Sequence, residues 1–347
     1  YASRGLGDVY KRQELTYLYC YSNQLTNLDV SKNTMLEALD CSSNKLTKLD
    51  LSKNTALIDL DCYSNQLTTL DLNKNTALTY LDCNSNQLTN LDLSDNTKLE
   101  TLWLNSNPLI SLNGVSSSVT DFNSAYLKSF ATTQSSITLS DYGIDESKIV
   151  TDSLTGGTIS DDGVLTPDSI PGTVTYTYDC DSGKTINCTI EFGAIEINET
   201  NFPDENFRNW IIAQSYGEDK ILTPSEIAWI THINVSNIDI SDLKGIEYFT
   251  ELTKLDCREN NLTELDVSKN KKLVALVCFS NKLTNLDVSE NTKLTNLSCY
   301  RNNLTKLDLS ENTVLNILYC YSNPLTSLDL SATAVTKLEP VDTILAT

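Results

Sequence analysis

Apolar and polar residues repeat along the chain in a fixed order with a period of 21 residues. The frame reads L-x-x-L-x-C-x-x-N-x-L-x-x-L-D-[LV]-S-x-N-T-x and recurs nine times in register. Its cysteine position holds Cys20, Cys41, Cys62, Cys83, Cys257, Cys278, Cys299 and Cys320, and in the fifth repeat Leu104 replaces the cysteine. A fixed period of this length predicts a solenoid, because a single repeat cannot bury its leucines and stacked neighbours can.

The frame is that of leucine-rich repeats, and its short period resembles bacterial surface proteins of the internalin-like type. The resemblance covers about residues 14–115 and 241–340. It implies a leucine-rich repeat horseshoe whose concave faces bind other molecules. The predicted fold class is a β-rich solenoid in two arrays, residues 14–115 and 241–347, separated by a small all-β domain and a short helical cap.

Residues 116–196 lose the period and contain alternating runs at 173–178 and 186–192, on either side of a D-S-G-K turn. This pattern predicts a hairpin in a small all-β domain. A turn centred on Ser182–Gly183 would pair position 180 with 185, which puts Cys180 and Cys188 out of register. A disulfide between them is therefore left open and is not predicted. An Ig-like fold is implied here only by the resemblance to internalins.

Residues 197–240 are predicted to be a helical cap on the second array. One helix is expected to start at residues 201–204 with Pro203 in its first turn, and a capping box at 223–226 opens a second helix through Trp229. The side chains expected to cover the core are Phe207, Trp210 and Ile211.

The segment Ser215 to Glu226 can be aligned with a calcium-binding EF-hand loop. Only Asp219 and Glu226 then stand at ligand positions, and Lys220 stands where the loop needs glycine. The sequence therefore predicts a degenerate EF-hand-like cap without calcium.

Residues 1–13 are set aside from the predicted fold. Ser3 to Gln13 reads SRGLGDVYKRQ, which is the translation of eleven codons of a common transposase-type sequencing adapter. We interpret this stretch as an assembly artefact, so the native sequence is expected to enter near Glu14, inside a repeat. A missing signal peptide then says nothing against secretion.

The net charge of -21 over 347 residues excludes some classes of partner. Nucleic-acid binding needs a positive surface and adsorption to anionic lipid needs basic residues, so neither is expected. No apolar run in the sequence is long enough to span a bilayer. Composition and resemblance together predict an extracellular or cell-surface protein, and we expect a monomer.

The conserved positions of the frame predict structural roles rather than cofactor or metal binding. Eight of the ten cysteines take a core-facing position, where free Cys behaves as a small apolar residue, so they predict a buried thiol ladder. Their parallel side chains suit neither disulfides nor a tetrahedral zinc site. The Asp and Ser of the L-D-[LV]-S segment are predicted to cap turns on the convex side, and the Asn of C-x-x-N to form a buried ladder.

The residues between the inward Leu, Cys and Asn are predicted to face out from the concave strands and to carry the function. In the first array they form an acidic centre bordered by aromatic rings: Asp40, Asp59, Asp61 and Asp82, with Tyr17, Tyr19, Tyr21, Tyr63, Tyr80 and Trp103. In the second array they are aromatic with a basic edge: Arg258, Phe279, Tyr300, Tyr319 and Tyr321. Such rows suit protein recognition and also stacking on sugars, although β-propensity alone places Tyr on strands. The acidic centre predicts a basic or cation-bridged partner.

Catalysis is not expected. His232 is the only histidine, has no nucleophile motif around it and is expected to be a strand or cap residue. The aspartates of the first array lie on an open face, without the enclosed pocket that separates the pKa values of a catalytic pair. The sequence therefore predicts a non-catalytic protein-binding or adhesion module. The alternative is an accessory targeting or spacer region, binding protein or carbohydrate, of a larger secreted enzyme whose catalytic domain is not in this sequence.

Overall fold

The structure is a computed structural model that describes residues 15–338. The stretch interpreted as adapter sequence, residues 1–13, lies outside this range. The chain divides after Gly193 into two compact units. Among the described residues, no helix is long and apolar enough to cross a membrane.

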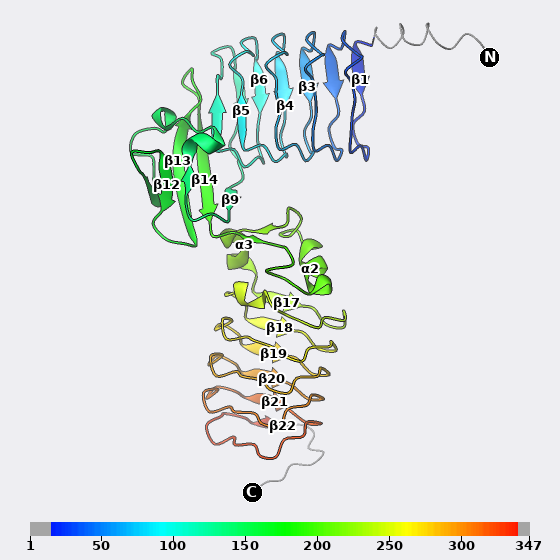
Figure 1. Ribbon diagram of the computed structural model, residues 1–347, viewed down its shortest axis with the longest axis vertical. Helices are drawn as coiled ribbons and strands as arrows, with labels where there is room; N and C mark the ends of the chain where they lie inside the picture. Colours follow the sequence, from blue (N-terminus) through cyan, green and yellow to red (C-terminus); the bar gives the residue numbers. More distant parts are fainter. Residues whose placement is uncertain (1–14, 339–347) are drawn as a thin grey trace, which may run out of the picture. The chain divides into compact units, whose positions relative to one another are not determined.

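The first unit begins with a parallel sheet to which successive turns of the solenoid contribute one short strand each (Figure 1). The strand order is β1 (Tyr17–Tyr19), β2 (Ala38–Asp40), β3 (Asp59–Asp61), β4 (Tyr80–Asp82), β6 (Thr101–Trp103) and β8 (Asp121–Asn123). β8 belongs to this sheet although its residues follow position 115. β5 (Asn90–Asp92) and β7 (Ser111–Asn113) pair in parallel and form a separate two-stranded sheet.

The repeat frame explains why these strands are short and stacked. The leucine at each strand centre points into the solenoid, and Leu60 and Leu81 are 0% exposed. The cysteine that follows the strand points the same way, and Cys62 is also 0% exposed. The predicted thiol ladder is confirmed, because all eight frame cysteines are free, six are buried, and only the end members Cys20 and Cys320 are half-buried.

After each strand the chain turns, and the frame asparagine in this turn forms hydrogen bonds with backbone atoms of its own repeat and of the preceding one. Asn65 Nδ2 donates to the carbonyl oxygens of Cys41 and Cys62 at 3.0 and 3.1 Å, and Asn65 Oδ1 accepts from the Leu46 amide at 3.0 Å. The residue before it, Ser64, has a left-handed φ of 53°. These bonds join two successive repeats, so the predicted asparagine ladder is confirmed.

The rest of the first unit contains two small sheets. One has the order β10 (Ile137–Thr138), β12 (Val164–Pro167), β11 (Gly157–Ile159), and the other has the order β13 (Gly172–Asp179), β14 (Thr185–Phe192), β9 (Phe130–Thr132). Two 3-10 helices, η1 (Leu139–Tyr142) and η2 (Glu146–Lys148), lie between β10 and β11. β13 and β14 form the predicted hairpin, whereas β9 pairs with β14 in parallel. The Ig-like topology stays a prediction.

The predicted register of this hairpin is wrong by one residue. The Cys180 amide donates to the Lys184 carbonyl at 2.9 Å, so position 180 pairs with 184 and not with 185. The cause is the short loop Asp181–Gly183, whose three residues all have positive φ. Cys188 then stands opposite Tyr176, and both Cys180 and Cys188 are free and buried.

The second unit opens with the helical cap. Its elements are β15 (Ile195–Glu196), α2 (Glu205–Ile212), β16 (Ile221–Leu222) and α3 (Pro224–Trp229). α2 begins after its N-cap residue Asp204, so Pro203 precedes the helix and the prediction that it stands in the first turn is wrong. The predicted capping box is confirmed, because the Thr223 side chain accepts from the Glu226 amide while the Glu226 side chain accepts from the Thr223 amide.

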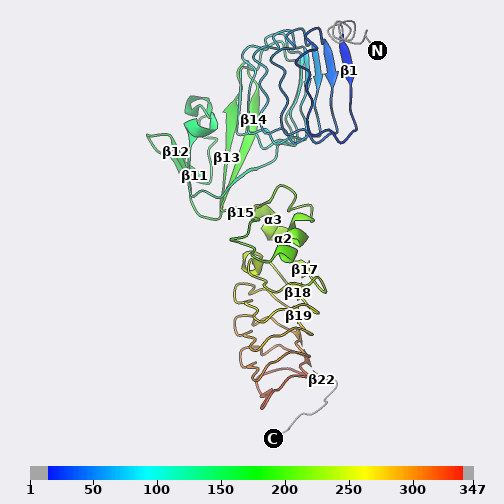
Figure 2. The ribbon, with the colours of Figure 1, turned by 45° about the vertical axis from the view of Figure 1, so that its right-hand side comes forward.

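The parallel sheet of the second array follows directly from the cap (Figure 2). Its order is β17 (His232–Asn234), β18 (Lys254–Asp256), β19 (Ala275–Val277), β20 (Asn296–Ser298), β21 (Ile317–Tyr319) and β22 (Lys337–Leu338), with the 3-10 helix η3 (Ile246–Tyr248) before β18. Phe202, Phe207 and Ile211 of the cap are 0% exposed and join the same core as the repeat leucines. Trp210 packs against that core and is partly buried.

Candidate functional site

In-register pairing turns the variable residues of the first array into continuous rows on the outward side of its sheet, the first strand face. The centre row is formed by Tyr19, Asp40, Asp61, Asp82, Trp103 and Asn123, which are direct partners on successive strands. The row two residues earlier is formed by Tyr17, Ala38, Asp59, Tyr80, Thr101 and Asp121. Partners in a row lie about 4.8 Å apart at the backbone, so the sheet brings the predicted aspartates together.

Exposure differs strongly along the first strand face. Tyr17, Tyr19 and Tyr21 are 55%, 64% and 54% exposed, whereas Asp82 is only 6% exposed. Tyr63 is 37% exposed. The face therefore has an exposed tyrosine end and a more enclosed acidic centre.

The acidic centre lacks a neutralising partner within the described residues, since none of its four carboxylates forms an ion pair with Lys or Arg there. Three of them accept hydrogen bonds only from the turn that follows their own strand: Asp40, Asp61 and Asp82 accept from the backbone amide two residues later at 3.1, 3.4 and 2.9 Å. Asp40 also accepts from the Ser42 hydroxyl at 2.6 Å. Burial, reinforced by the neighbouring Asp82, raises the pKa of Asp61 to about 7. Burial also raises the pKa values of Asp59 and Asp82, in both cases reinforced by Asp40.

Aromatic rings border this centre on the side of β6. The rings of Tyr80 and Trp103 meet edge to face, with centroids 5.8 Å apart and planes at 66°. Burial raises the pKa of Tyr80 to about 12, with Asp82 and Asp61 adding to the effect. The phenol thus stays neutral and can act as a hydrogen-bond donor beside the carboxylates.

The second strand face, the outward side of β17–β22, has different chemistry. Phe279, Tyr300 and Tyr321 stack face to face with centroid distances of 4.1 and 4.3 Å and interplanar angles of 13° and 10°. The Arg258 guanidinium carbon lies 5.7 Å from the Phe279 centroid, so this cation ends the stack. Arg258 also pairs with Asp256 at 3.7 Å. The predicted residue Tyr319 lies on β21 and is half-buried.

Two residues of the first strand face were not predicted from the sequence. Asp121 continues the row of Asp59 and Tyr80, and Tyr126, just beyond β8, is 77% exposed. They were missed because β8 follows β6 after 20 residues and carries no frame cysteine. The signal was present in Val119 and Phe122, which keep the L-x-x-L spacing.

The sheet of the second array begins before residue 241, its predicted start. His232 and Asn234 stand in β17, the first strand of that sheet, paired with Lys254 and Asp256. The prediction that His232 is a strand or cap residue is therefore confirmed. Its Nδ1 lies 2.9 Å from the Thr231 hydroxyl.

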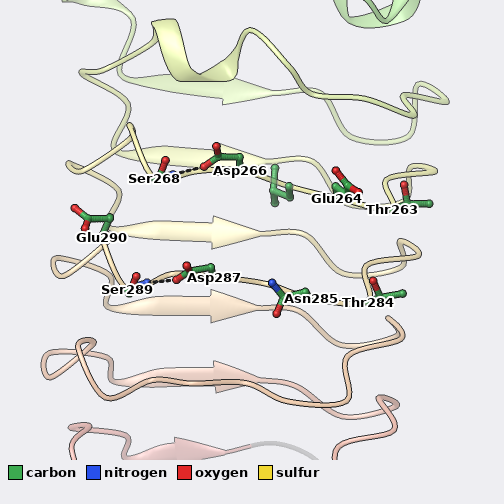
Figure 3. Close-up of a pocket in the computed structure, with 10 residues that line it drawn as sticks. Thr263, Glu264, Asp266, Ser268, Thr284, Asn285, Asp287, Ser289 and Glu290 are labelled. Carbon is green, nitrogen blue, oxygen red and sulfur yellow. Dashed lines mark hydrogen bonds between the residues drawn. The ribbon is translucent and has the colours of Figure 1, made fainter.

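The opposite side of the solenoid carries the frame aspartates and shallow hollows. A hollow of about 500 Å3 lies between two turns of the second array and is lined by Asp266 and Asp287 (Figure 3). These carboxylates accept from the Ser268 and Ser289 amides at 2.9 and 3.0 Å, as predicted for turn caps. Hollows of about 270 and 260 Å3 recur at residues 48–74 and 306–332, so they follow from the repeat geometry. None of the three is lined by a residue of either strand face.

Metal-ligand geometry is not found in the part of the chain that the structure describes. No group of three or more His, Cys, Asp or Glu side chains there could hold a metal ion. In the cap, the Ile221 amide donates to Asp219 Oδ1 at 3.0 Å and the Thr223 amide donates to Glu226 Oε2 at 2.9 Å, and the absence of calcium from this segment stays a prediction.

Comparison with known proteins places these repeats beside internalins. No family model matches the chain. Over 133 residues the chain is 35% identical to Internalin J of Listeria monocytogenes serotype 4b, which corresponds to 36% of this chain and 14% of that protein. The chain thus spans about a seventh of the length of that relative. The repeats are internalin-like leucine-rich repeats.

Two solved structures extend the comparison. The functional domain of InlJ from Listeria monocytogenes, which includes a cysteine ladder, is 26% identical with a TM-score of 0.34, over 96% of this chain and 60% of that one. An internalin, inlF, from Listeria monocytogenes is 16% identical with a TM-score of 0.31, over 95% of this chain and 74% of that one.

Proposed function

We propose that this chain, a leucine-rich repeat protein similar to Internalin J, is a non-catalytic binding module that recognises another protein outside the cell or at its surface. Its two strand faces are the binding surfaces. The observation that carries the proposal is the group of exposed tyrosines on the first strand face, Tyr17, Tyr19, Tyr21 and Tyr63, for which the described residues of the turn side have no counterpart. The second strand face adds the half-buried aromatic stack of Phe279, Tyr300 and Tyr321. Tyr, Trp and Arg are the side chains that most often supply binding energy at protein interfaces.

Protein fits the second strand face better than carbohydrate does. A sugar stacks on the open face of an aromatic ring, but here the faces of Tyr300 are covered by Phe279 on one side and Tyr321 on the other. The ring edges and hydroxyl groups remain for contact, beside the cation of Arg258. Edges, hydroxyls and a guanidinium suit the polar and apolar mixture of a protein surface.

The absence of catalysis is part of the proposal. The aspartates of the first strand face are successive rungs of an open sheet. His232, the only histidine of the chain, lies on β17 in the second unit and is exposed. Its Nδ1 lies beside the Thr231 hydroxyl, but no acidic side chain among the described residues bonds to the imidazole and orients it, as the triad of an acyl-transfer site would need.

The test is selection of random peptides displayed on phage against the immobilised full chain. The site variant carries Tyr19→Ala, Tyr63→Ala and Trp103→Ala together, all on the first strand face. The control is Trp229→Ala, which removes an 86% exposed tryptophan from α3 of the cap.

Peptides enriched on the unaltered chain are expected to bind the control and to lose about tenfold or more in affinity on the site variant. Equal binding to all three proteins would overturn the assignment of this face. A glycan array probed with the same proteins provides the other arm, and binding there that depends on the three side chains would replace protein by carbohydrate as the partner.

A further inference from the structure

Asp82 is an unusual carboxylate for a strand face, because it is 94% removed from solvent and its charge has no cationic partner among the described residues. Its Oδ1 accepts one hydrogen bond, from the Asn84 amide at 2.9 Å. No hydrogen bond from the described residues reaches its Oδ2, which keeps a small exposure to solvent and so can be reached by a ligand. A buried carboxylate with one satisfied oxygen is costly, and a ligand that donates to the second oxygen would lower that cost.

A second unsatisfied acceptor stands two residues further on the same strand face. The side-chain oxygen Oδ1 of Asn84 is buried and has no hydrogen-bond partner among the described residues. Asp82 Oδ2 and Asn84 Oδ1 are therefore two side-chain acceptors to which no donor of the described residues is bonded. A ligand that complements them has to bring N–H or O–H groups, and cationic side chains bring the most.

The neighbours of Asp82 strengthen this preference. Asp61 is its direct partner on β3, and Trp103 is its direct partner on β6. Tyr80, two residues before Asp82, meets the Trp103 ring edge to face. Carboxylates beside indole and phenol rings bind ammonium and guanidinium groups through both ion pairing and cation–π attraction.

A metal ion fits the same residues poorly. Asp40, Asp61 and Asp82 follow one another at strand spacing and form a row, and no three of the described acidic side chains converge as ligands. A bound metal needs converging oxygens at short distance, whereas a row of carboxylates suits several cations carried along one chain.

We propose that the first strand face binds a lysine- or arginine-rich peptide segment of its partner, with one cationic side chain seated on Asp61 and Asp82 beside Trp103 and Tyr80. This inference rests on the proposed function and adds the chemistry of the partner. The second strand face does not share the preference, because Arg258 already places a cation at the end of its aromatic stack.

Protonation provides an independent signature of this site. The groups that face Asp61 are Asp59 on its own strand, Asp40 on β2, and Asp82 and Tyr80 on β4. With the pKa of Asp61 at about 7, part of the site is uncharged in mild acid. A cation prefers the ionised form, so its affinity is expected to rise as the pH rises through this value.

The direct test is calorimetric titration of the full chain with octa-arginine at about 0.15 M salt, where diffuse attraction is screened beyond about 8 Å. The site variant is Asp61→Asn/Asp82→Asn. The matched control is Asp50→Asn/Asp71→Asn, which removes the same charge from neighbouring turns on the opposite side, where both aspartates cap turns. Thermal unfolding verifies that each variant is folded, and Asp61→Asn alone serves if the double variant is not.

The site variant is expected to bind octa-arginine about tenfold or more weakly, and the control within about twofold of the unaltered chain. Trp103→Leu is expected to weaken binding about threefold through the lost cation–π contact. Equal weakening by the two double variants would overturn the proposal, since it would mean that only the net charge attracts the peptide.

The peptide selection separates this inference from the proposed function. If the enriched peptides depend on Tyr19, Tyr63 and Trp103 and are rich in Lys or Arg, both are supported. If they depend on those side chains and lack Lys and Arg, the cationic partner is wrong and the binding function stands. If none depends on the strand face, the proposed function itself fails.

Discussion

Asp61 and Asp82 are direct partners on the adjacent parallel strands β3 and β4, and neither charge is neutralised within the described residues. Like charges on neighbouring strands destabilise a sheet, and burial at this position adds to the cost of ionising both. The sheet holds them together because the leucines that precede them on the two strands, Leu60 and Leu81, are 0% exposed in the core. The two carboxylates of the proposed binding surface therefore lower the free energy of unfolding of the first unit.

This pair predicts how the stability of the first unit depends on pH. The pKa of Asp61 is about 7 in the folded chain, against about 3.9 in an unfolded one. Between these values the folded state binds more protons, so its free energy of unfolding decreases as the pH rises from about 4 to about 7. Asp61→Asn is expected to flatten this decrease.

Urea unfolding followed by Trp103 fluorescence, in a Trp210→Phe/Trp229→Phe background, measures the effect at several pH values. The matched control is Asp50→Asn. A hydrogen bond from the Ser52 amide lowers the pKa of Asp50, so this residue contributes stability that is lost only as the pH falls below about 4. An Asp61→Asn chain with an unchanged pH profile above that value would contradict the prediction.

The rows of the two strand faces could be predicted because the period assigns every residue to a side of the sheet. Asp40, Asp61 and Asp82 share one frame position, and β2, β3 and β4 pair them in register. The inward positions were equally predictable, since a leucine that recurs with the period has to enter a shared core.

Properties that depend on the neighbours of a residue could not be predicted. The frame position is the same for Asp61 and Asp82, but only the structure shows that Asp82 is 6% exposed and that the Trp103 ring meets the Tyr80 ring edge to face. The stacking of Phe279 on Tyr300 depends on side-chain rotamers, which a period does not fix. The end of the first array was not predicted, because β8 keeps the spacing of the frame in Val119 and Phe122 but has no frame cysteine.

The asparagine ladder predicts a large loss of stability from a single amide. Asn65→Ala removes bonds to the preceding repeat and leaves the Cys41 carbonyl and the Leu46 amide without these partners. We expect the free energy of unfolding to fall by about 3 kcal/mol. The exposed Asn27, changed to Ala, is the control, and its effect is expected to stay within about 0.5 kcal/mol in the same urea titration. Similar losses from the two variants would mean that the ladder does not tie the repeats together.

The thiol ladder predicts selective chemical protection. Burial raises the pKa of Cys41 to about 12, so its reactive thiolate is scarce near neutral pH. In the native chain, Ellman's reagent is expected to react only with the half-buried end members, Cys20 and Cys320. In the unfolded chain all ten thiols should react. A Cys20→Ser/Cys320→Ser variant is expected not to react with the reagent until it unfolds. Rapid reaction of further thiols in that variant would show that the ladder opens.

The hydrogen bonds of Asp204 are predicted to stabilise the cap and its contact with the second array. Its Oδ1 caps α2 through the Phe207 amide at 3.0 Å, and its Oδ2 accepts from the Ser241 amide and hydroxyl at 2.8 and 2.9 Å. Asp204→Ala is expected to cost about 2–3 kcal/mol, which combines a lost helix cap with lost bonds to the start of the array. The adjacent exposed Glu205, changed to Ala, is the control. Hydrogen exchange of α2 amides measures the effect, and equal exchange in both variants would contradict the double role.

The aromatic stack predicts a measurable coupling between side chains of successive repeats. Tyr300 lies 4.1 Å from Phe279 and 4.3 Å from Tyr321 between ring centroids, so Tyr300→Ala removes both stacking contacts at once. A double-mutant cycle of Phe279→Ala and Tyr300→Ala is expected to give a coupling of about 0.5–1.5 kcal/mol, because stacked rings contribute beyond the area they bury.

Tyr300→Phe tests whether that coupling comes from the rings alone, since it keeps the ring and removes the hydroxyl. It is expected to retain the coupling and the near-ultraviolet circular dichroism of the stacked rings, which Tyr300→Ala should reduce. A coupling close to zero would mean that the three rings are neighbours without being a unit. The second strand face would then present independent side chains, each free to turn its ring face to a ligand. A carbohydrate could then stack on these rings, so the preference for a protein partner would no longer hold.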